Sequence, residues 1–148
     1  MSYTSVITLA SAKEYLGVDD TSRDTEISRM ITSALSFLEK RTNIHVKTKD
    51  KTYYFMDGCV RVYDFPINTE TPTEVESETS ELSTLYSTNN SDVKSITLNI
   101  GHTDITQIDP DWIEAGYSII AHLYYGKSLK DVPDTIMDFI NINKRFIL

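Results

Sequence analysis

Hydrophobic and polar positions follow a helical period over residues 24–41. Apolar residues recur there every three or four positions, which predicts one long amphipathic helix. Its apolar stripe consists of Ile27, Met30, Ile31, Ala34, Leu35 and Leu38. Asp24 and Glu26 lie near the positive end of the helix dipole. Lys40 and Arg41 lie near its negative end, so the charges at both ends support the same helix.

A shorter helix is expected over residues 9–16. Thr8 is a good N-cap because its hydroxyl can accept a hydrogen bond from a backbone N–H of the first turn. Gly17 is suited to end the helix at the C′ position. The residues predicted to share its apolar face are Leu9, Ala12, Tyr15 and Leu16.

A third helix is expected from Asp109, as the N-cap, and Pro110, at the first helical position, to about residue 125. Its apolar residues cover most of the circumference, which indicates a central helix packed on several sides or at a subunit interface. These residues are Trp112, Ile113, Tyr117, Ile119, Ile120, Leu123 and Tyr124. A last short helix is expected to begin near Pro133.

The middle of the chain has the composition of strands. Segments 52–56 and 60–63 flank Asp57-Gly58, a pair that favours a two-residue hairpin turn. A second pair of strands is expected at 81–86 and 93–100, the latter because apolar and polar residues alternate in it. Residues 67–80 are Thr, Glu, Ser and Pro with little to bury, so we expect a disordered arm there.

The predicted fold class is therefore mainly α (α+β): a small bundle of about four helices with an inserted antiparallel β-hairpin or small sheet. One domain is expected over residues 1–148, since this length suits a single modest core. Residues 67–92 are expected to form a flexible acidic insertion in it.

The net charge of −8 is unevenly placed. Residues 64–111 hold ten acidic groups and one basic group, whereas the charges of residues 1–63 and of 112–148 nearly cancel. A protein that grips DNA needs a basic patch, so this distribution argues against tight DNA binding. Two interpretations remain open: a solvated or disordered acidic segment, or a surface that must lie near DNA without holding it.

One basic stretch stands against this acidic background. It consists of Lys40, Arg41, Lys47, Lys49 and Lys51, with Asp50 as its one acidic member. Such a run is often a solvated helix end and loop. The alternative is a contact with an acidic partner, such as the acidic middle of a neighbouring subunit.

The sequence predicts no catalytic residue, no cofactor and no metal site. Gly126-Lys127-Ser128 is similar to the end of a phosphate-binding loop, but that loop requires a glycine where this chain has Ala121. His102 and Asp104 supply two possible ligands, which do not make a metal site. A single cysteine excludes an internal disulfide, and neither a signal peptide nor a membrane span is expected.

The order of these elements resembles that of phage head–tail connector proteins, also called adaptor or head-completion proteins. The resemblance lies in two N-terminal phrases, Ile7-Thr8-Leu9 and Ala12-Lys13-Glu14-Tyr15-Leu16, then Val18-Asp19-Asp20 and the helix end Phe37-Leu38-Glu39-Lys40-Arg41-Thr42. Further along come Gly101, Pro110, Ile119-Ile120-Ala121-His122-Leu123-Tyr124-Tyr125, Asp131-Val132-Pro133 and Arg145. It covers about residues 5–66 and 93–146, and leaves 67–92 as an insertion.

The resemblance implies a structural protein of the virion neck and not an enzyme. Such proteins form a ring, usually twelve-fold, beneath the portal protein. The ring extends the channel through which DNA passes without sequence-specific binding, and it offers a docking platform to the stopper or tail-completion protein. No membrane partner is implied. The alternative function is a small acidic soluble binding module that regulates a host or phage protein.

Three sets of residues are assigned to contacts on this basis. The portal-facing tail is Lys144, Arg145, Phe146, Ile147 and Leu148. The acidic arm, facing the channel or the next ring, is Glu70, Glu74, Glu76, Glu78 and Glu81. The subunit interface is Lys40, Arg41, Lys47, Lys49, Lys51, Trp112, Tyr117 and Tyr124.

Overall fold

A computed structural model of the chain describes residues 1–143. Its helices are α1 (Tyr3–Val6), α2 (Leu9–Leu16), α3 (Asp24–Thr42), α4 (Pro110–Tyr124) and α5 (Asp134–Asn143), with 3-10 turns η1 (Ile105–Gln107) and η2 (Leu129–Asp131). Its strands are β1 (Lys49–Tyr54), β2 (Cys59–Val62), β3 (Glu76–Thr79), β4 (Thr84–Ser87) and β5 (Ser95–Ile100). None of these helices combines the length and the apolar character that crossing a bilayer requires.

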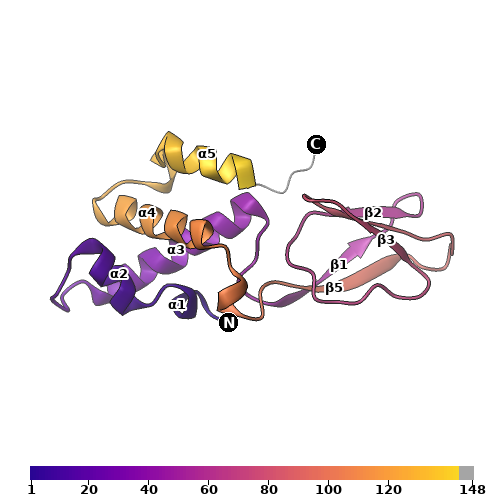
Figure 1. The fold of residues 1–148 in the computed structure, drawn as a ribbon, viewed down its shortest axis with the longest axis horizontal. Coiled ribbons are helices and arrows are strands. Elements are labelled where there is room, and N and C mark those ends of the chain that lie inside the picture. Colours follow the sequence, from indigo (N-terminus) through magenta and orange to yellow (C-terminus); the bar gives the residue numbers. More distant parts are fainter. Residues whose placement is uncertain (144–148) are drawn as a thin grey trace.

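The molecule has a helical half and a β half, which lie at opposite ends of its long axis (Figure 1). The chain passes from the helical half to the β half after α3 and returns after β5. Both passages lie near the middle of the molecule, so the two halves meet at a narrow junction (Figure 1).

The predicted helices are confirmed, including their ends. Thr8 caps α2 by accepting a hydrogen bond from the Ser11 N–H, and Gly17 ends it in a left-handed conformation. Asp109 caps α4 in the same way, with Pro110 in the first turn. The short helix α1 was not expected, because four residues are too few to show a period.

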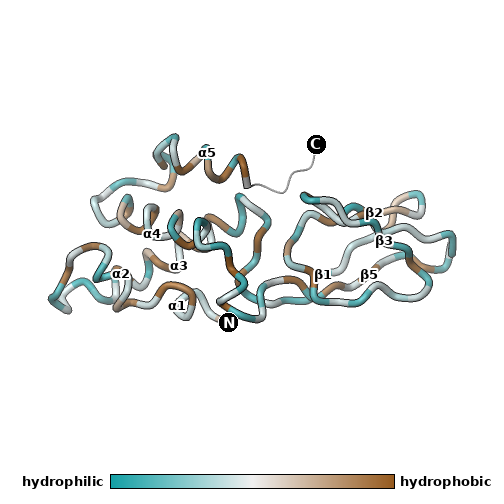
Figure 2. The backbone as a smooth tube through the Cα atoms, viewed as in Figure 1, coloured by the Kyte–Doolittle hydropathy of each residue, from teal (hydrophilic) through white to brown (hydrophobic). Residues whose placement is uncertain are grey.

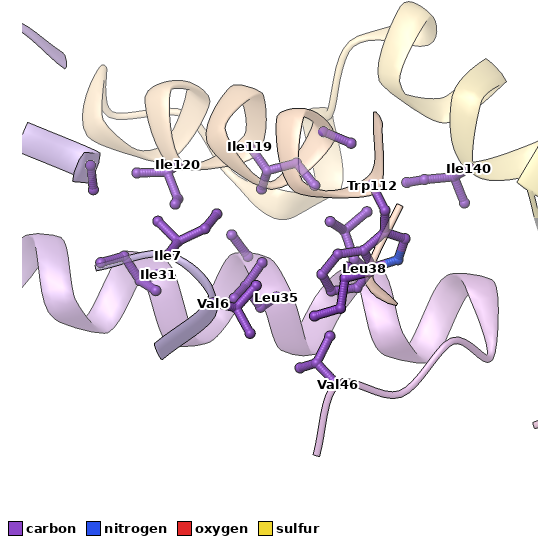
Figure 3. Close-up of a cluster of buried hydrophobic side chains, with 14 of the residues drawn as sticks. Val6, Ile7, Ile31, Leu35, Leu38, Val46, Trp112, Ile119, Ile120 and Ile140 are labelled. Carbon is purple, nitrogen blue, oxygen red and sulfur yellow. The ribbon is translucent and has the colours of Figure 1, made fainter. Parts of the chain in front are cut away.

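The core of the helical half lies between α3 and α4 (Figure 3). Leu35 and Leu38 of α3 meet Ile119 and Trp112 of α4, and Ile140 of α5 closes the cluster beside Trp112 (Figure 3). Because α4 contacts α2, α3 and α5, most of its apolar circumference is covered within its own chain. The wide apolar surface of α4 therefore has an explanation that needs no second subunit.

The β half consists of two small antiparallel sheets, β1–β5 and β2–β4–β3. The predicted alternation in β5 is confirmed, since Ile96, Leu98 and Ile100 are buried between exposed or half-exposed neighbours. The six buried members of the second core are Val62, Val75, Tyr86, Ile96, Leu98 and Ile100. These residues come from both sheets, so the sheets pack against each other through them.

The predicted hairpin between segments 52–56 and 60–63 is wrong, although its turn exists. Asp57 and Gly58 both have positive φ, and Met56 and Cys59 exchange two backbone hydrogen bonds across them. Beyond this turn the strands part: β1 pairs with β5, and β2 pairs with β4. The second pair of strands, expected at 81–86 and 93–100, is present as β4 and β5, but these two strands lie in different sheets.

The predicted fold class must also be corrected. Residues 1–143 form a mixed α+β fold with five helices and five strands in two sheets, not a bundle of about four helices with an inserted hairpin or small sheet. The physical reason is that residues 53–100 hold enough inward-facing apolar side chains to close a second core. In Figure 2, brown and teal alternate along the helices, and the β half has short brown stretches between white and teal ones.

Candidate interaction surfaces and the junction

The basic residues assigned to a subunit interface lie on the surface. All five are exposed: Lys40, Arg41, Lys47, Lys49 and Lys51. Three have partners within the described part of the chain, one of them Arg41, whose guanidinium carbon lies 5.3 Å from the centre of the Phe37 ring. The Lys47 Nζ lies 3.8 Å from the centre of the Tyr3 ring, and the Lys51 Nζ lies 2.8 Å from an Asp64 carboxylate oxygen. Lys49 and Lys51 lie on β1, so the structure extends the basic stretch along one strand of the β half.

The acidic arm is exposed throughout. Its members are Glu70, Glu74, Glu76, Glu78 and Glu81. Glu76 and Glu78 belong to β3, where Ser77 lies opposite the buried Tyr86. Because neighbouring strand residues point to opposite faces, the two glutamates point away from the core of the β half.

The three aromatic residues assigned to an interface are all used within the chain. Trp112 is 1% exposed, and its indole N–H donates to the Thr42 hydroxyl at 3.2 Å. Trp112 is therefore a core residue with no surface to offer a second subunit. Tyr117 stacks on Tyr15 with ring centres 5.0 Å apart, and the Tyr124 ring lies beneath the Arg23 guanidinium. Residues 144–148, assigned to the portal-facing tail, lie outside the described residues.

A buried carboxylate, Asp64, organises the β side of the junction. Its Oδ1 lies 2.5 Å from the His45 Nε2, and its Oδ2 accepts hydrogen bonds from the Lys51 ammonium and the Tyr53 hydroxyl. Burial alone would raise the pKa of Asp64, but these hydrogen bonds outweigh it and hold that pKa well below its usual range. Asp64 therefore ties β1 to the segment that leaves α3.

A second buried carboxylate, Glu39, organises the helical side. It projects from α3 and accepts hydrogen bonds from the Val46 N–H at 2.7 Å and from the Tyr3 hydroxyl at 2.5 Å. Burial and the hydrogen bond to Glu39 together raise the pKa of Tyr3 to about 12. Through Glu39, the long helix holds both α1 and the passage to β1.

The two passages between the halves are bonded to each other. The His102 N–H donates to the His45 carbonyl at 2.8 Å, and residues 43–45 exchange backbone hydrogen bonds with Phe65. The His102 ring is buried, meets Phe65 edge-on, and has an Nδ1 without a hydrogen-bond partner in the described part of the chain. Burial lowers the pKa of His102.

Sequence reasoning missed these junction residues, although two signals were present. Glu39 lies one helical turn after Leu35, at the border of the apolar stripe, where an unpaired carboxylate would be costly. Asp64 continues the inward positions of Val60 and Val62 at a spacing of two. A carboxylate at an inward position of a predicted helix or strand therefore indicated a buried polar contact.

An exposed apolar patch lies at the tip of β1, beside the Asp57-Gly58 turn. Tyr54 is 71% exposed and Met56 is 79% exposed. Large apolar side chains at such exposure are typical of contact surfaces when they occur together. The strand period of two contained this signal, because it places Tyr54 and Met56 on the face opposite the half-buried Tyr53 and Phe55.

Comparison with known proteins supplies one match. The family model described as phage gp6-like head-tail connector protein matches residues 6–102. The match runs through both halves, from α1 to the return passage, and includes residues 67–92. No curated protein and no solved structure matches the chain.

Proposed function

The chain belongs to the phage gp6-like head-tail connector proteins, and on this premise we propose that its copies form a ring beneath the portal protein of a tailed phage. The ring would extend the DNA channel and offer a platform to the stopper or tail-completion protein. The observation that carries this proposal is the family match over residues 6–102. Connector proteins are structural parts of the phage particle, so the proposed function belongs to the assembled ring and not to a single chain.

The distribution of charge supports assembly by contact between unlike surfaces. The basic residues of the stretch 40–51 are exposed, and so are Asp92 and Asp104 of the acidic middle, which do not belong to the acidic arm. A contact between unlike surfaces repeats from copy to copy and can close into a ring, twelve-fold in the form we propose. A reducing host cytoplasm, where the particle is assembled, suits a chain with one cysteine.

The decisive experiment is electron microscopy of phage particles and of portal-bearing heads incubated with the purified chain. We expect density for a ring of this chain at the vertex through which the genome leaves. Particles well resolved at that vertex but lacking such density would refute the proposal.

We propose that the acidic arm faces the channel. Negative charge on the wall would repel the phosphates of passing DNA and prevent its retention. Replacing Glu74, Glu76, Glu78 and Glu81 by Gln is expected to slow DNA ejection or raise the DNA retained in particles. A matched control replaces Asp19, Asp20 and Glu14, exposed in the helical half, by amides. Ejection unchanged from the wild type would contradict a channel-facing arm.

We propose further that residues 144–148 face the portal. Deleting them should leave a folded protein that no longer attaches to portal-bearing heads. Circular dichroism of the truncated chain checks the fold, and co-sedimentation with heads checks attachment. Attachment equal to that of the full chain would assign the portal contact elsewhere.

A further inference from the structure

A groove with an apolar floor lies between the C-terminal end of α3 and the start of α5. Phe37 of α3 and Met137 of α5 line it, together with Leu129 and Val132 from the segment that joins α4 to α5. Phe37, Leu129 and Met137 are only half-buried, although they pack against the core of the helical half. The groove therefore leaves apolar surface in contact with water, and covering that surface is favourable.

The rim of this groove is mainly basic. Arg41 of α3 and Lys130 of η2 lie at the rim, and both side chains are exposed. The Arg41 guanidinium lies over the Phe37 ring, so its charge is held next to the apolar floor. Asp134 is the acidic member of the lining among the described residues. The rim therefore has a net positive charge, which suits a partner that combines an apolar side chain with a carboxylate.

The turn η1 has this complementary composition. No residue of η1 is buried, and Ile105 is 37% exposed although its side chain is large and apolar. Asp104, directly before it, is also exposed. The Asp104 carboxylate accepts a hydrogen bond from the Thr106 N–H at 2.9 Å, which caps the turn and fixes the carboxylate next to Ile105. The turn therefore presents an isoleucine and a negative charge together.

The turn and the groove lie on opposite sides of the helical half. In Figure 1, η1 is the orange turn beside the N-terminus, below α4, whereas α5 lies above α4. The groove is bounded by α5 and by the segment that precedes it. One copy can therefore offer its turn to one neighbour and its groove to another, as a contact between unlike surfaces in a ring requires.

We propose, as a refinement that rests on the proposed ring, that η1 of one copy docks in the groove of the next copy. Ile105 covers the apolar floor beside Met137, and Asp104 meets Arg41 and Lys130 at the rim. Burial of Ile105 supplies the apolar contribution to this contact, and the opposite charges fix its orientation. The contact leaves the acidic arm free for the channel wall.

A charge exchange tests this contact. The double variant Arg41→Glu/Lys130→Glu should reduce assembly onto portal-bearing heads about tenfold, because Asp104 then meets like charges. Asp104→Arg should do the same, since it brings a third positive charge to the basic rim. The chain with all three changes should recover to within about threefold of the wild type, because opposite charges again face each other.

Two controls separate loss of the contact from loss of the fold. Asp104→Asn keeps an oxygen that can cap the turn but removes the charge, so assembly should fall by only about threefold. Lys49→Glu/Lys94→Glu reverses two exposed charges of the β half, away from the groove, and should assemble as the wild type does. Circular dichroism of every variant checks that the helices are retained.

A cross-link tests the proposed placement of Ile105. In the Cys59→Ser background, Ile105→Cys/Met137→Cys should form disulfides between copies on portal-bearing heads after mild oxidation, giving a ladder of oligomers. Ile105→Cys/Thr32→Cys is the control pair and should give no ladder. Thr32 is exposed on α3, two and a half turns before Arg41 and therefore on the opposite side of that helix.

The outcomes separate this inference from the proposed function. Absence of a ring of the wild-type chain on heads would overturn both. A ring that assembles at the wild-type level from both charge-reversed variants would overturn the docking of η1 and leave the ring. Cross-linking of the test pair no stronger than that of the control pair would likewise overturn the docking alone. Loss in both reversed variants, recovery in the exchanged chain and the ladder together support it.

Discussion

In the helical half, fifteen buried apolar residues form one core around α3 and α4, whereas the core of the β half has six. Distant parts of the chain meet in both halves, since α3 packs on α4, β1 pairs with β5 and β2 pairs with β4, whereas β3 and β4 form a local hairpin. The difference teaches where the buried apolar surface of the molecule resides. Most of it lies in the helical half, whereas the β half carries exposed charged residues on small sheets that the junction holds in place.

The largest expected effect comes from breaking the junction with Gly101→Ala. A Cβ at Gly101 would lie 2.2 Å from the Lys47 carbonyl oxygen, and its φ of +110° is unfavourable for alanine. We expect unfolding free energy to fall by about 4 kcal/mol, from the backbone clash and the strained φ together. Urea denaturation measures this loss.

Gly126→Ala is the matched control for that prediction. Gly126 also has positive φ, but nothing lies within 4 Å of its added Cβ. It should lose only about 1 kcal/mol, the cost of the left-handed conformation alone. Equal losses in the two variants would mean that the close approach of the two passages does not hold the halves together.

The second prediction compares the two cores through Leu35→Ala in the helical half and Leu98→Ala in the β half. Both side chains are fully buried. Leu35→Ala should cost about 3–4 kcal/mol, and Leu98→Ala about 2 kcal/mol because the small second core relaxes more easily around a cavity. The fluorescence of Trp112, the single tryptophan, reports the helical half during denaturation.

The same pair of variants tests coupling between the halves. If the junction transmits stability, Leu98→Ala shifts the denaturation midpoint seen by Trp112, although the mutation lies in the other core. A midpoint equal to that of the wild type would show that the halves unfold separately and that the junction does not transmit stability between them.

The sequence predicted the elements of the helical half better than the strand pairing of the β half. The starts of α2 and α4 were predictable because a cap acts on residues two or three positions away, as Asp109 and Thr8 do. Strand pairing is not local: Asp57-Gly58 made its turn as predicted, yet β1 found its partner more than forty residues along the chain, in β5. The alternation within β5 shows which face is buried and does not identify the neighbouring strand.

The candidate surfaces were predictable in composition and not in placement. The exposed basic and acidic residues are visible in the sequence, but the assignment of β1 and β3 to different sheets follows from the strand order, which no local pattern encodes. Trp112 illustrates the reverse case. An apolar residue on a crowded helix suits an interface or a core equally well, and the packing of α3 and α5 decides for the core.

A third, smaller effect is expected from Asp64→Asn at the junction. The variant keeps the shape of the side chain but loses the charge that the Lys51 ammonium and His45 meet, and we expect a loss of about 2–3 kcal/mol at neutral pH. Because the folded pKa of Asp64 lies below its unfolded value of 3.8, this contribution is present above that pH and lost as the pH falls below it. Urea denaturation of the wild type and the variant at neutral and at acidic pH measures the loss of stability and its pH dependence.

Asp50→Asn serves as the comparison for Asp64→Asn. Asp50 is exposed and bonds to the Asn99 side chain, so its replacement should change unfolding free energy by less than about 0.5 kcal/mol. A loss at Asp64 no larger than that at Asp50 would show that the buried cluster does not stabilise the junction.

The smallest expected effect concerns His102, the buried ring between the two passages. Burial lowers the folded pKa of His102 below its ordinary value of 6.5, so the unfolded chain takes up its proton first as the pH falls. The wild type should therefore lose stability as the pH falls below about 6.5. His102→Leu removes the proton acceptor and the unpartnered Nδ1, so it should change unfolding free energy by less than about 1 kcal/mol near pH 8.

Near pH 5 the His102→Leu variant should lose less stability than the wild type, because no buried imidazole then opposes folding. Denaturation of both proteins at the two pH values checks the difference. An identical pH dependence would show that the acid sensitivity does not come from the buried His102 ring packed against Phe65.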